Sequence, residues 1–162
     1  MEGKIYVGYP CIGKTSISGE NGCIDLDSST MFMKPDGVGL KFVRPDGWEE
    51  IYVNVALSLA RQGYKVFLSS HNLVTKYLKS IGVDFTIICP SISLADEWKK
   101  RAKERFKNDG SSKNLRALAR IIDYYEEDIQ SLLDLSVDKI VIDDINYDLR
   151  DKIKNKEYIL TK

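Results

Sequence analysis

The chain has few of the features that place a protein outside the cytosol. Only three of its 162 residues are cysteine, Cys11, Cys23 and Cys89, and they stand singly, without the paired spacing of a zinc site. An odd number of cysteines with no signal-like N-terminus indicates reduced thiols in the cytosol. The apolar runs are far shorter than the roughly 20 residues that cross a bilayer. We therefore expect a cytoplasmic protein with no membrane partner.

An excess of charge of one sign is also lacking. The 24 basic and 24 acidic side chains cancel, so no net charge draws the chain to nucleic acid or to a membrane surface. The single histidine, His71, excludes a site built from several histidines. Repeats and low-complexity tracts are absent from the sequence. A chain of this length is typical of one domain, which we expect to cover residues 1–162.

The most informative motif is the segment at residues 8–15, Gly-Tyr-Pro-Cys-Ile-Gly-Lys-Thr, which follows a short apolar run. It fits the pattern of the phosphate-binding P-loop, or Walker A motif. Its glycines let the backbone wrap round a phosphate with several N–H groups pointing inward, and the following helix start adds its positive dipole end. We expect Lys14 to reach the β- and γ-phosphates and the Thr15 hydroxyl to hold magnesium. The motif predicts ATP or another nucleoside triphosphate, with Mg²⁺, bound by Gly8, Pro10, Cys11, Ile12, Gly13, Lys14, Thr15 and Ser16.

The rest of the chain alternates between short buried strands and amphipathic helices. This order predicts an α/β protein with a three-layer P-loop fold, in which a five-stranded parallel sheet is flanked by helices. The helix after the phosphate loop is expected to end almost at once, at Gly19. Residues 34–47 carry two turn signals and predict a loop or small hairpin. Strands are expected at 4–7, 23–26, 64–69, 85–89 and 139–142, and the longer helices at 48–62, 72–81, 93–106 and 114–133.

Polar residues follow the second and third expected strands, at the edge where such sheets bind ligands. Asp25 and Asp27 lie on one side of the strand, where they bind the water shell of magnesium or accept a proton from a substrate hydroxyl. Alternatively, Ser28 or Ser29 only caps a helix. We expect His71 either to contact phosphate or substrate, or only to start a helix. We assign Asp27 to magnesium and catalysis, and Asp25, Ser29 and His71 to the substrate.

The helix at 94–106 has an inward stripe that includes Arg105, with Arg101 at its edge. Arginines on a buried face need anionic partners, because burying them unpaired is costly. A triphosphate is one such partner, and two arginines would neutralise charge during phosphoryl transfer. Carboxylates of the protein are the alternative partner. Arg116 and Arg120 of the next helix are candidates for the same patch.

In the order of its parts the chain resembles the nucleoside and nucleotide kinase group of P-loop proteins. The phosphate loop together with Asp-Leu-Asp-Ser-Ser at 25–29 resembles small, often phage-encoded, kinase-like P-loop proteins. The resemblance implies a lid at about 91–113 whose arginines clamp the phosphates, and Arg101 and Arg105 match that place. It also implies that the acidic pair serves substrate and magnesium. Two departures are the short helix after the loop and Ser69-Ser70-His71 in place of an Asp-Arg pair.

We therefore hypothesise an ATP- and magnesium-dependent phosphotransferase acting on a small acceptor, most simply a nucleoside or nucleotide. Its catalytic residues would be Lys14, Asp27, Arg101 and Arg105. The two departures favour an alternative, a nucleotide-binding regulatory or interaction protein with little catalysis. A third hypothesis is a P-loop ATPase acting on nucleic acid, because Ile142-Asp143-Asp144 resembles the magnesium-binding strand end of ATP-driven motors. Neutral charge and a single domain argue against nucleic acid as a partner.

Overall fold

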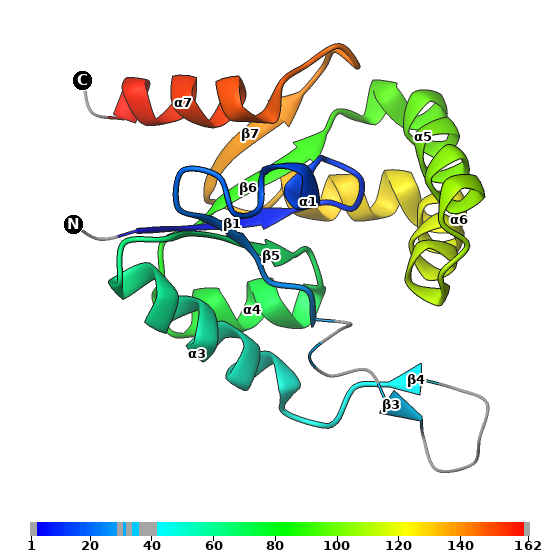
Figure 1. Ribbon diagram of the computed structural model, residues 1–162. Coiled ribbons are helices and arrows are strands. Elements are labelled where there is room, and N and C mark those ends of the chain that lie inside the picture. Colours follow the sequence, from blue (N-terminus) through cyan, green and yellow to red (C-terminus); the bar gives the residue numbers. More distant parts are fainter. Residues whose placement is uncertain (1–2, 29–30, 32–33, 36–41, 161–162) are drawn as a thin grey trace. The chain divides into compact units, whose positions relative to one another are not determined.

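The structure is a computed structural model that describes residues 3–28, 31, 34–35 and 42–160. Its main sheet has five parallel strands in the order β2-β5-β1-β6-β7, flanked by helices (Figure 1), which confirms the predicted fold class. The chain divides into two compact units. The first unit comprises Met1–Gly8 and Thr15–Phe85, and the second comprises Tyr9–Lys14 and Thr86–Lys162. Among the described residues, no helix is both long and apolar enough to cross a membrane.

The first unit is built round three parallel strands, β1 (Lys4–Gly8), β2 (Cys23–Asp25) and β5 (Lys65–Ser69). β5 pairs with both of the others. Its centre, residues 66–68, is fully buried, as a continuous apolar run in a parallel sheet predicts. Helices α3 (Trp48–Arg61) and α4 (Asn72–Ser80) pack on each other, and α3 also packs on β1 and β5.

The two small elements of the first unit match the sequence predictions. Helix α1 (Lys14–Ile17) is a single turn, and Gly19 follows it with a left-handed φ of 87°. Strands β3 (Lys34–Pro35) and β4 (Phe42–Val43) form an antiparallel pair, which confirms the small hairpin.

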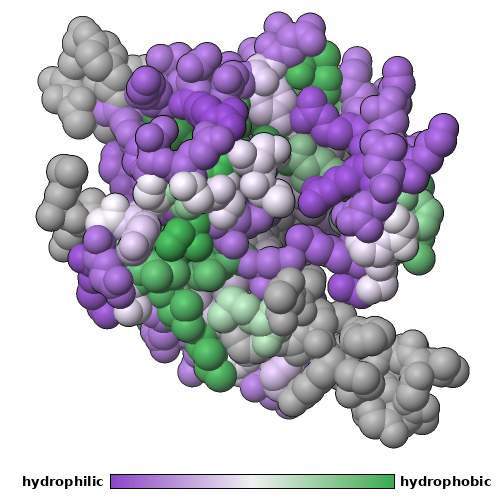
Figure 2. All heavy atoms as spheres, in the orientation of Figure 1, coloured by the Kyte–Doolittle hydropathy of each residue, from purple (hydrophilic) through white to green (hydrophobic). Residues whose placement is uncertain are grey.

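Helix α3 shows where helical periodicity alone misplaces a face. It begins after Gly47, whose φ of 77° is left-handed. Apolar residues at helical spacing in the sequence predict an inward stripe of Trp48, Ile51, Tyr52, Val55 and Leu59. Tyr52 is fully buried, but the prediction for Ile51 was wrong, because 56% of it is exposed. Figure 2 shows hydrophobic surface over this helix. The stripe is rotated from the expected one because small residues form most of it; its buried members are Trp48, Tyr52, Val53, Ala56 and Ala60.

The second unit contains the parallel strands β6 (Thr86–Pro90) and β7 (Asp138–Ile142). A 3₁₀ turn, η1 (Ile92–Leu94), leads into α5 (Ala95–Asn108), which packs along α6 (Ser112–Leu133). Helical spacing in the sequence predicts an inward stripe of Leu94, Trp98, Ala102 and Phe106 in α5; the first three are buried, whereas Phe106 is half-buried. The predicted lid segment at 91–113 therefore comprises η1, α5 and the start of α6.

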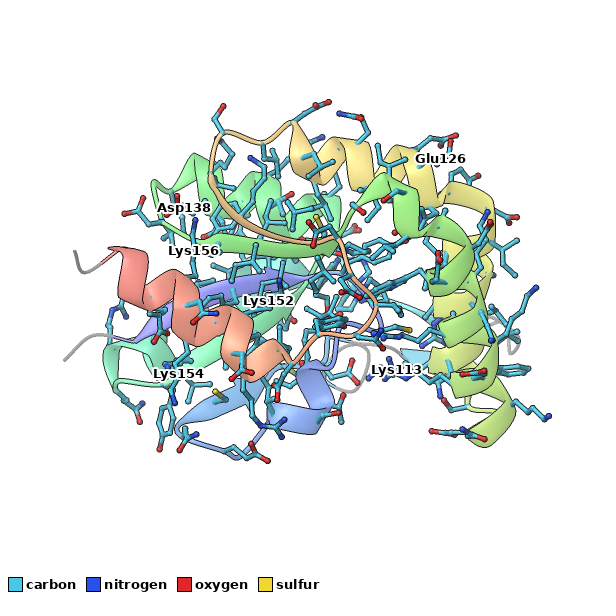
Figure 3. All side chains as sticks on the ribbon, turned by 90° about the horizontal axis from the view of Figure 1, so that it is seen from above. Lys113, Glu126, Asp138, Lys152, Lys154 and Lys156 are labelled. Carbon is cyan, nitrogen blue, oxygen red and sulfur yellow. The ribbon has the colours of Figure 1, made fainter. Side chains whose placement is uncertain are left out.

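Helix α7 (Leu149–Leu160) closes the second unit and packs on β7. This helix is not predicted by the sequence pattern, because its lysines obscure the apolar period. Ile153 is buried, and Lys154 lies on the opposite side of the helix from Lys152 and Lys156 (Figure 3). The lysines therefore surround the helix instead of forming one basic face.

Candidate functional site

The second unit contains residues 9–14 of the predicted phosphate loop, between the end of β1 and the start of α1. The loop begins with a hydrogen bond from the Tyr9 N–H to the Ile88 carbonyl of β6, at 2.9 Å. Two of its residues have left-handed backbones, Gly13 with φ 103° and Cys11 with φ 70°. Glycine adopts this conformation freely, whereas a residue with a Cβ does so at a cost. The bend at Cys11 therefore needs support from its surroundings.

Three side chains hold three consecutive carbonyls of this loop. The Trp98 indole N–H donates to the Pro10 carbonyl at 2.8 Å, and Arg101 Nη1 donates to the Cys11 carbonyl at 3.2 Å. The Tyr147 hydroxyl donates to the Ile12 carbonyl at 2.8 Å. These three residues, which we call the carbonyl-binding triad, come from α5 and from the segment after β7.

The triad fixes the direction of the loop N–H groups. The described peptide bonds are all trans, and in a trans peptide the C=O and N–H point in opposite directions. Carbonyls held on the side of the triad therefore turn the N–H groups of residues 11, 12 and 13 to the other side. In the part of the chain that the structure describes, none of these three N–H groups donates a hydrogen bond to the protein. They are available to an anion, which is the arrangement that phosphate binding requires.

Arg101 lies against both aromatic rings of the triad. Its guanidinium carbon is 4.6 Å from the Trp98 ring centroid and 5.2 Å from that of Tyr147, and the two rings are nearly parallel. Nη1 also donates to the Tyr147 hydroxyl at 2.7 Å, and Nη2 donates to the Ile145 carbonyl at 3.4 Å. We expected anionic partners for this arginine; the partners in the structure are carbonyls, a phenol oxygen and π faces.

Tyr147 is therefore both an acceptor and a donor. Burial raises the pKa of its hydroxyl, and the nearby Arg101 charge lowers that pKa in part. The phenol stays protonated at neutral pH, so it can accept from Arg101 while it donates to Ile12.

Arg105 lies one turn further along α5 and also contacts the loop. Its Nη1 is 3.7 Å from the Sγ of Cys11, which is buried. Arg120 has a different partner, because it forms two 2.7 Å bonds with the Asp128 carboxylate. The carboxylate alternative thus holds for Arg120, whereas Arg101 and Arg105 both contact Cys11.

In the first unit, the predicted magnesium ligand Thr15 lies beside the end of β2. Its hydroxyl donates to Asp25 Oδ2 at 3.2 Å, and the Asp25 N–H donates to the Ser18 hydroxyl at 3.1 Å. Asp27 is two residues further along and half-buried. A hydroxyl next to a carboxylate is a hard-oxygen donor set of the kind that suits Mg²⁺. Within the described residues no three His, Cys, Asp or Glu side chains gather as a metal cluster.

The carboxyl ends of β2 and β5 are joined by Tyr52 of α3. Its hydroxyl donates to the Leu26 carbonyl and accepts from the Ser69 N–H at 2.9 Å. Burial raises the pKa of Tyr52 to about 12, although the hydrogen bonds with Ser69 lower it in part. The Ser69 hydroxyl also lies 3.4 Å from that of Ser28, which accepts from Arg44 Nη2 at 3.2 Å.

Aromatic side chains accompany these polar groups. His71 meets the Trp48 ring edge to face, with centroids 5.3 Å apart, and the Arg44 guanidinium lies 4.9 Å from the same ring. His71 is the N-cap residue of α4, as the helix-start alternative predicted, and its role toward a substrate stays a prediction. Ser29, the other predicted substrate residue, lies outside the described residues.

Sequence reasoning missed several residues that the structure brings to these clusters. Trp98 was assigned only to the core, although its indole N–H reaches the loop. Tyr147 and Tyr52 were not singled out as donors. For Tyr147 the sequence did carry a signal, since this residue follows the carboxyl end of a strand, where ligands bind in parallel sheets. The acidic pair after β7 begins with Asp143, which is exposed.

Comparison with known proteins adds no assignment. No protein-family model matches the chain, and no curated protein matches it. The functional interpretation therefore depends on the residues and their contacts.

Proposed function

We propose that the protein binds a nucleoside triphosphate with Mg²⁺ and transfers the γ-phosphoryl group to a small acceptor, such as a nucleoside or nucleotide. The observation that carries this proposal is the orientation of the phosphate loop. Three consecutive carbonyls are held on one side by the carbonyl-binding triad, so three consecutive N–H groups are presented on the other. Such N–H groups next to a lysine support the binding of an anion.

The loop and Lys14 supply the binding of the phosphates. The N–H groups of residues 11, 12 and 13 donate to phosphate oxygens, and the Lys14 ammonium neutralises charge on the β- and γ-phosphates. Because transferring a phosphoryl group requires mainly positioning and charge stabilisation, these groups also contribute to catalysis. Of the two arginines on α5, Arg105 is the better candidate to stabilise the transferring group.

Thr15 and Asp25 would hold the magnesium ion, so that Asp25 takes the metal role that the sequence analysis gave to Asp27. The Thr15 hydroxyl, directly after Lys14 in the chain, already contacts the Asp25 carboxylate. Both groups offer the oxygen ligands that Mg²⁺ prefers, the carboxylate directly or through a water. When bound, the ion would neutralise charge on the phosphate oxygens. Asp27 is then left to orient the acceptor hydroxyl or to accept its proton.

The ends of β2 and β5 favour an acceptor with a planar, polar group. Ser69 and His71, which are half-buried, offer a hydroxyl and an aromatic ring there, and they contact the buried Ser28 and Trp48. A nucleoside presents a flat base together with hydroxyls and fits this mixture of groups.

The test is phosphate transfer from radiolabelled ATP to a panel of nucleosides, nucleoside monophosphates and 5′-hydroxyl oligonucleotides. We expect transfer to one class, and a fall of at least about 100-fold in Lys14→Ala, in which the phosphate charge is no longer neutralised. Lys107→Ala, at an exposed position of α5, is the matched control and should keep full activity.

Two other results would refute the proposal that the protein is a phosphotransferase. Tight ATP binding with no transfer to any acceptor would favour the regulatory protein, which the single turn of α1 and Ser69-Ser70-His71 motivate. Hydrolysis stimulated by DNA or RNA would favour the nucleic-acid ATPase.

A further inference from the structure

The carbonyl-binding triad has a role of its own. We propose that Trp98, Arg101 and Tyr147 are positioning residues that preset the phosphate loop for the triphosphate, and that Arg101 acts through the loop and not as a clamp on the phosphates. The inference rests on the proposed function, because it assumes that the loop binds phosphate.

The first argument is the backbone of Cys11. Its φ of 70° is unfavourable for a residue with a Cβ, and nothing local in the sequence favours it. The carbonyl of this residue is the one that Arg101 holds, while Trp98 and Tyr147 hold the carbonyls on either side. Three neighbouring peptide planes are thus fixed by side chains that lie far away in the sequence. A loop fixed in this way does not have to order itself when the nucleotide binds, so the affinity is higher.

The second argument is the packing of Arg101. A guanidinium held against two rings loses rotational freedom, and its flat, delocalised charge suits contact with aromatic rings better than the ammonium group of lysine does. Its two terminal nitrogens donate to Cys11, Tyr147 and Ile145. A direct clamp on phosphate would require these bonds to break, and a charged donor makes them strong.

The third argument is that the triad is linked within itself. The Tyr147 hydroxyl accepts from Arg101 and donates to Ile12, so one phenol oxygen connects the arginine to the loop. The effects of changing either residue should therefore be coupled.

The experiment compares the affinities of ATP and of inorganic tripolyphosphate for three variants by calorimetry, without an acceptor. Tyr147→Phe removes one oxygen and keeps the ring, Arg101→Lys keeps the charge, and Trp98→Phe removes the indole donor. We expect each to raise the Kd for both ligands by a similar factor, about 3- to 10-fold, as the loss of one hydrogen bond implies. The double variant Arg101→Lys/Tyr147→Phe should lose less than the product of the two single effects. Tyr124→Phe and Arg61→Gln, at exposed positions, are the matched controls and should bind as the wild type does.

Each outcome decides between the roles. If Arg101→Lys raises the Kd for ATP and tripolyphosphate while Tyr147→Phe and Trp98→Phe leave both Kd values unchanged, Arg101 is a clamp and the inference is wrong. If the variants melt earlier but the folded proteins bind both ligands with wild-type Kd, the triad is merely structural and the inference is wrong. If the wild type binds neither ATP nor tripolyphosphate, it is the proposed function that fails. If Trp98→Phe does not fold, the variants at the half-buried Arg101 and Tyr147 still distinguish a positioning role from a clamp.

Discussion

The hydroxyl of Tyr52 is the best place to test the first unit, because one atom joins the ends of two strands. Tyr52→Phe removes that atom and keeps the fully buried ring. The Leu26 carbonyl and the Ser69 N–H then lose their partner. An orphaned buried polar group costs about 1–3 kcal/mol. Leu26 is only half-buried, so water reaches its carbonyl in part. We therefore expect the free energy of unfolding to fall by about 2–3 kcal/mol.

Urea denaturation followed by tryptophan fluorescence measures this loss, and thermal melting provides a second estimate. For a chain of this size, 1 kcal/mol corresponds to about 2–4 °C, so the melting temperature should fall by about 4–12 °C. Tyr64→Phe is the matched control, since this tyrosine is 37% exposed, and it should melt within about 1 °C of the wild type. A loss below about 1 kcal/mol in Tyr52→Phe would show that the hydroxyl does not tie the strand ends together.

The same variant separates the two halves of the proposed reaction. Tyr52, Leu26 and Ser69 all belong to the first unit, whereas the carbonyl-binding triad belongs to the second. We expect Tyr52→Phe to raise the KM for the acceptor and to leave the Kd for ATP near its wild-type value. An equal loss for both ligands would contradict the assignment of the acceptor to the ends of β2 and β5.

Three further outcomes follow from the contacts. Asp25→Asn should raise the Mg²⁺ concentration that half-saturates ATP binding about 10-fold, because the carboxylate beside Thr15 loses its charge. Titration with Mg²⁺ in the presence of ATP measures this concentration, and an unchanged midpoint would show that Asp25 does not belong to the metal site. Arg120→Ala should cost only about 0.5–1 kcal/mol by urea denaturation despite the 2.7 Å bonds to Asp128, because the arginine side chain is 57% exposed; a loss above about 2 kcal/mol would refute this. The free energy of unfolding should fall between pH 10 and pH 12, because Tyr52 has a pKa of about 12 in the folded protein but near 10 when unfolded. The contribution of Tyr52 is complete below pH 10 and amounts to about 2–3 kcal/mol. It is measured as the difference between the wild type and Tyr52→Phe in urea denaturation across that range.

The fold could be predicted because its signals are local. Short apolar runs between amphipathic helices specify a parallel sheet, and each predicted strand of the main sheet is present within a few residues. The stripe of α5 was predictable for the same reason, since its large apolar residues recur at helical spacing. Helix α7 was missed because its many charges leave few apolar positions to show a period. The stripe of α3 was misplaced because alanines form much of the buried face, and alanine gives a weak hydrophobic signal.

The contacts of the candidate site could be predicted only in part. The sequence predicted an anionic partner for Arg101, but its partners among the described residues are neutral. The partners proved to be loop carbonyls and two rings, which come from segments far apart in the sequence. Sequence spacing along one helix shows which side chains share a face. It does not show which backbone oxygens that face will meet.

Cys11 shows what this means for the phosphate loop. The motif specifies glycine at both ends of the loop, where the backbone must turn tightly, yet one of the two left-handed residues is a cysteine in the middle. Local preference opposes that conformation, so the conformation must be stabilised by contacts from elsewhere. Those contacts are the hydrogen bonds of the carbonyl-binding triad. The motif therefore encodes the residues that would bind phosphate, whereas α5 and Tyr147 determine the direction in which the backbone donors point, and a change in the triad should impair phosphate binding as a change in the loop itself does.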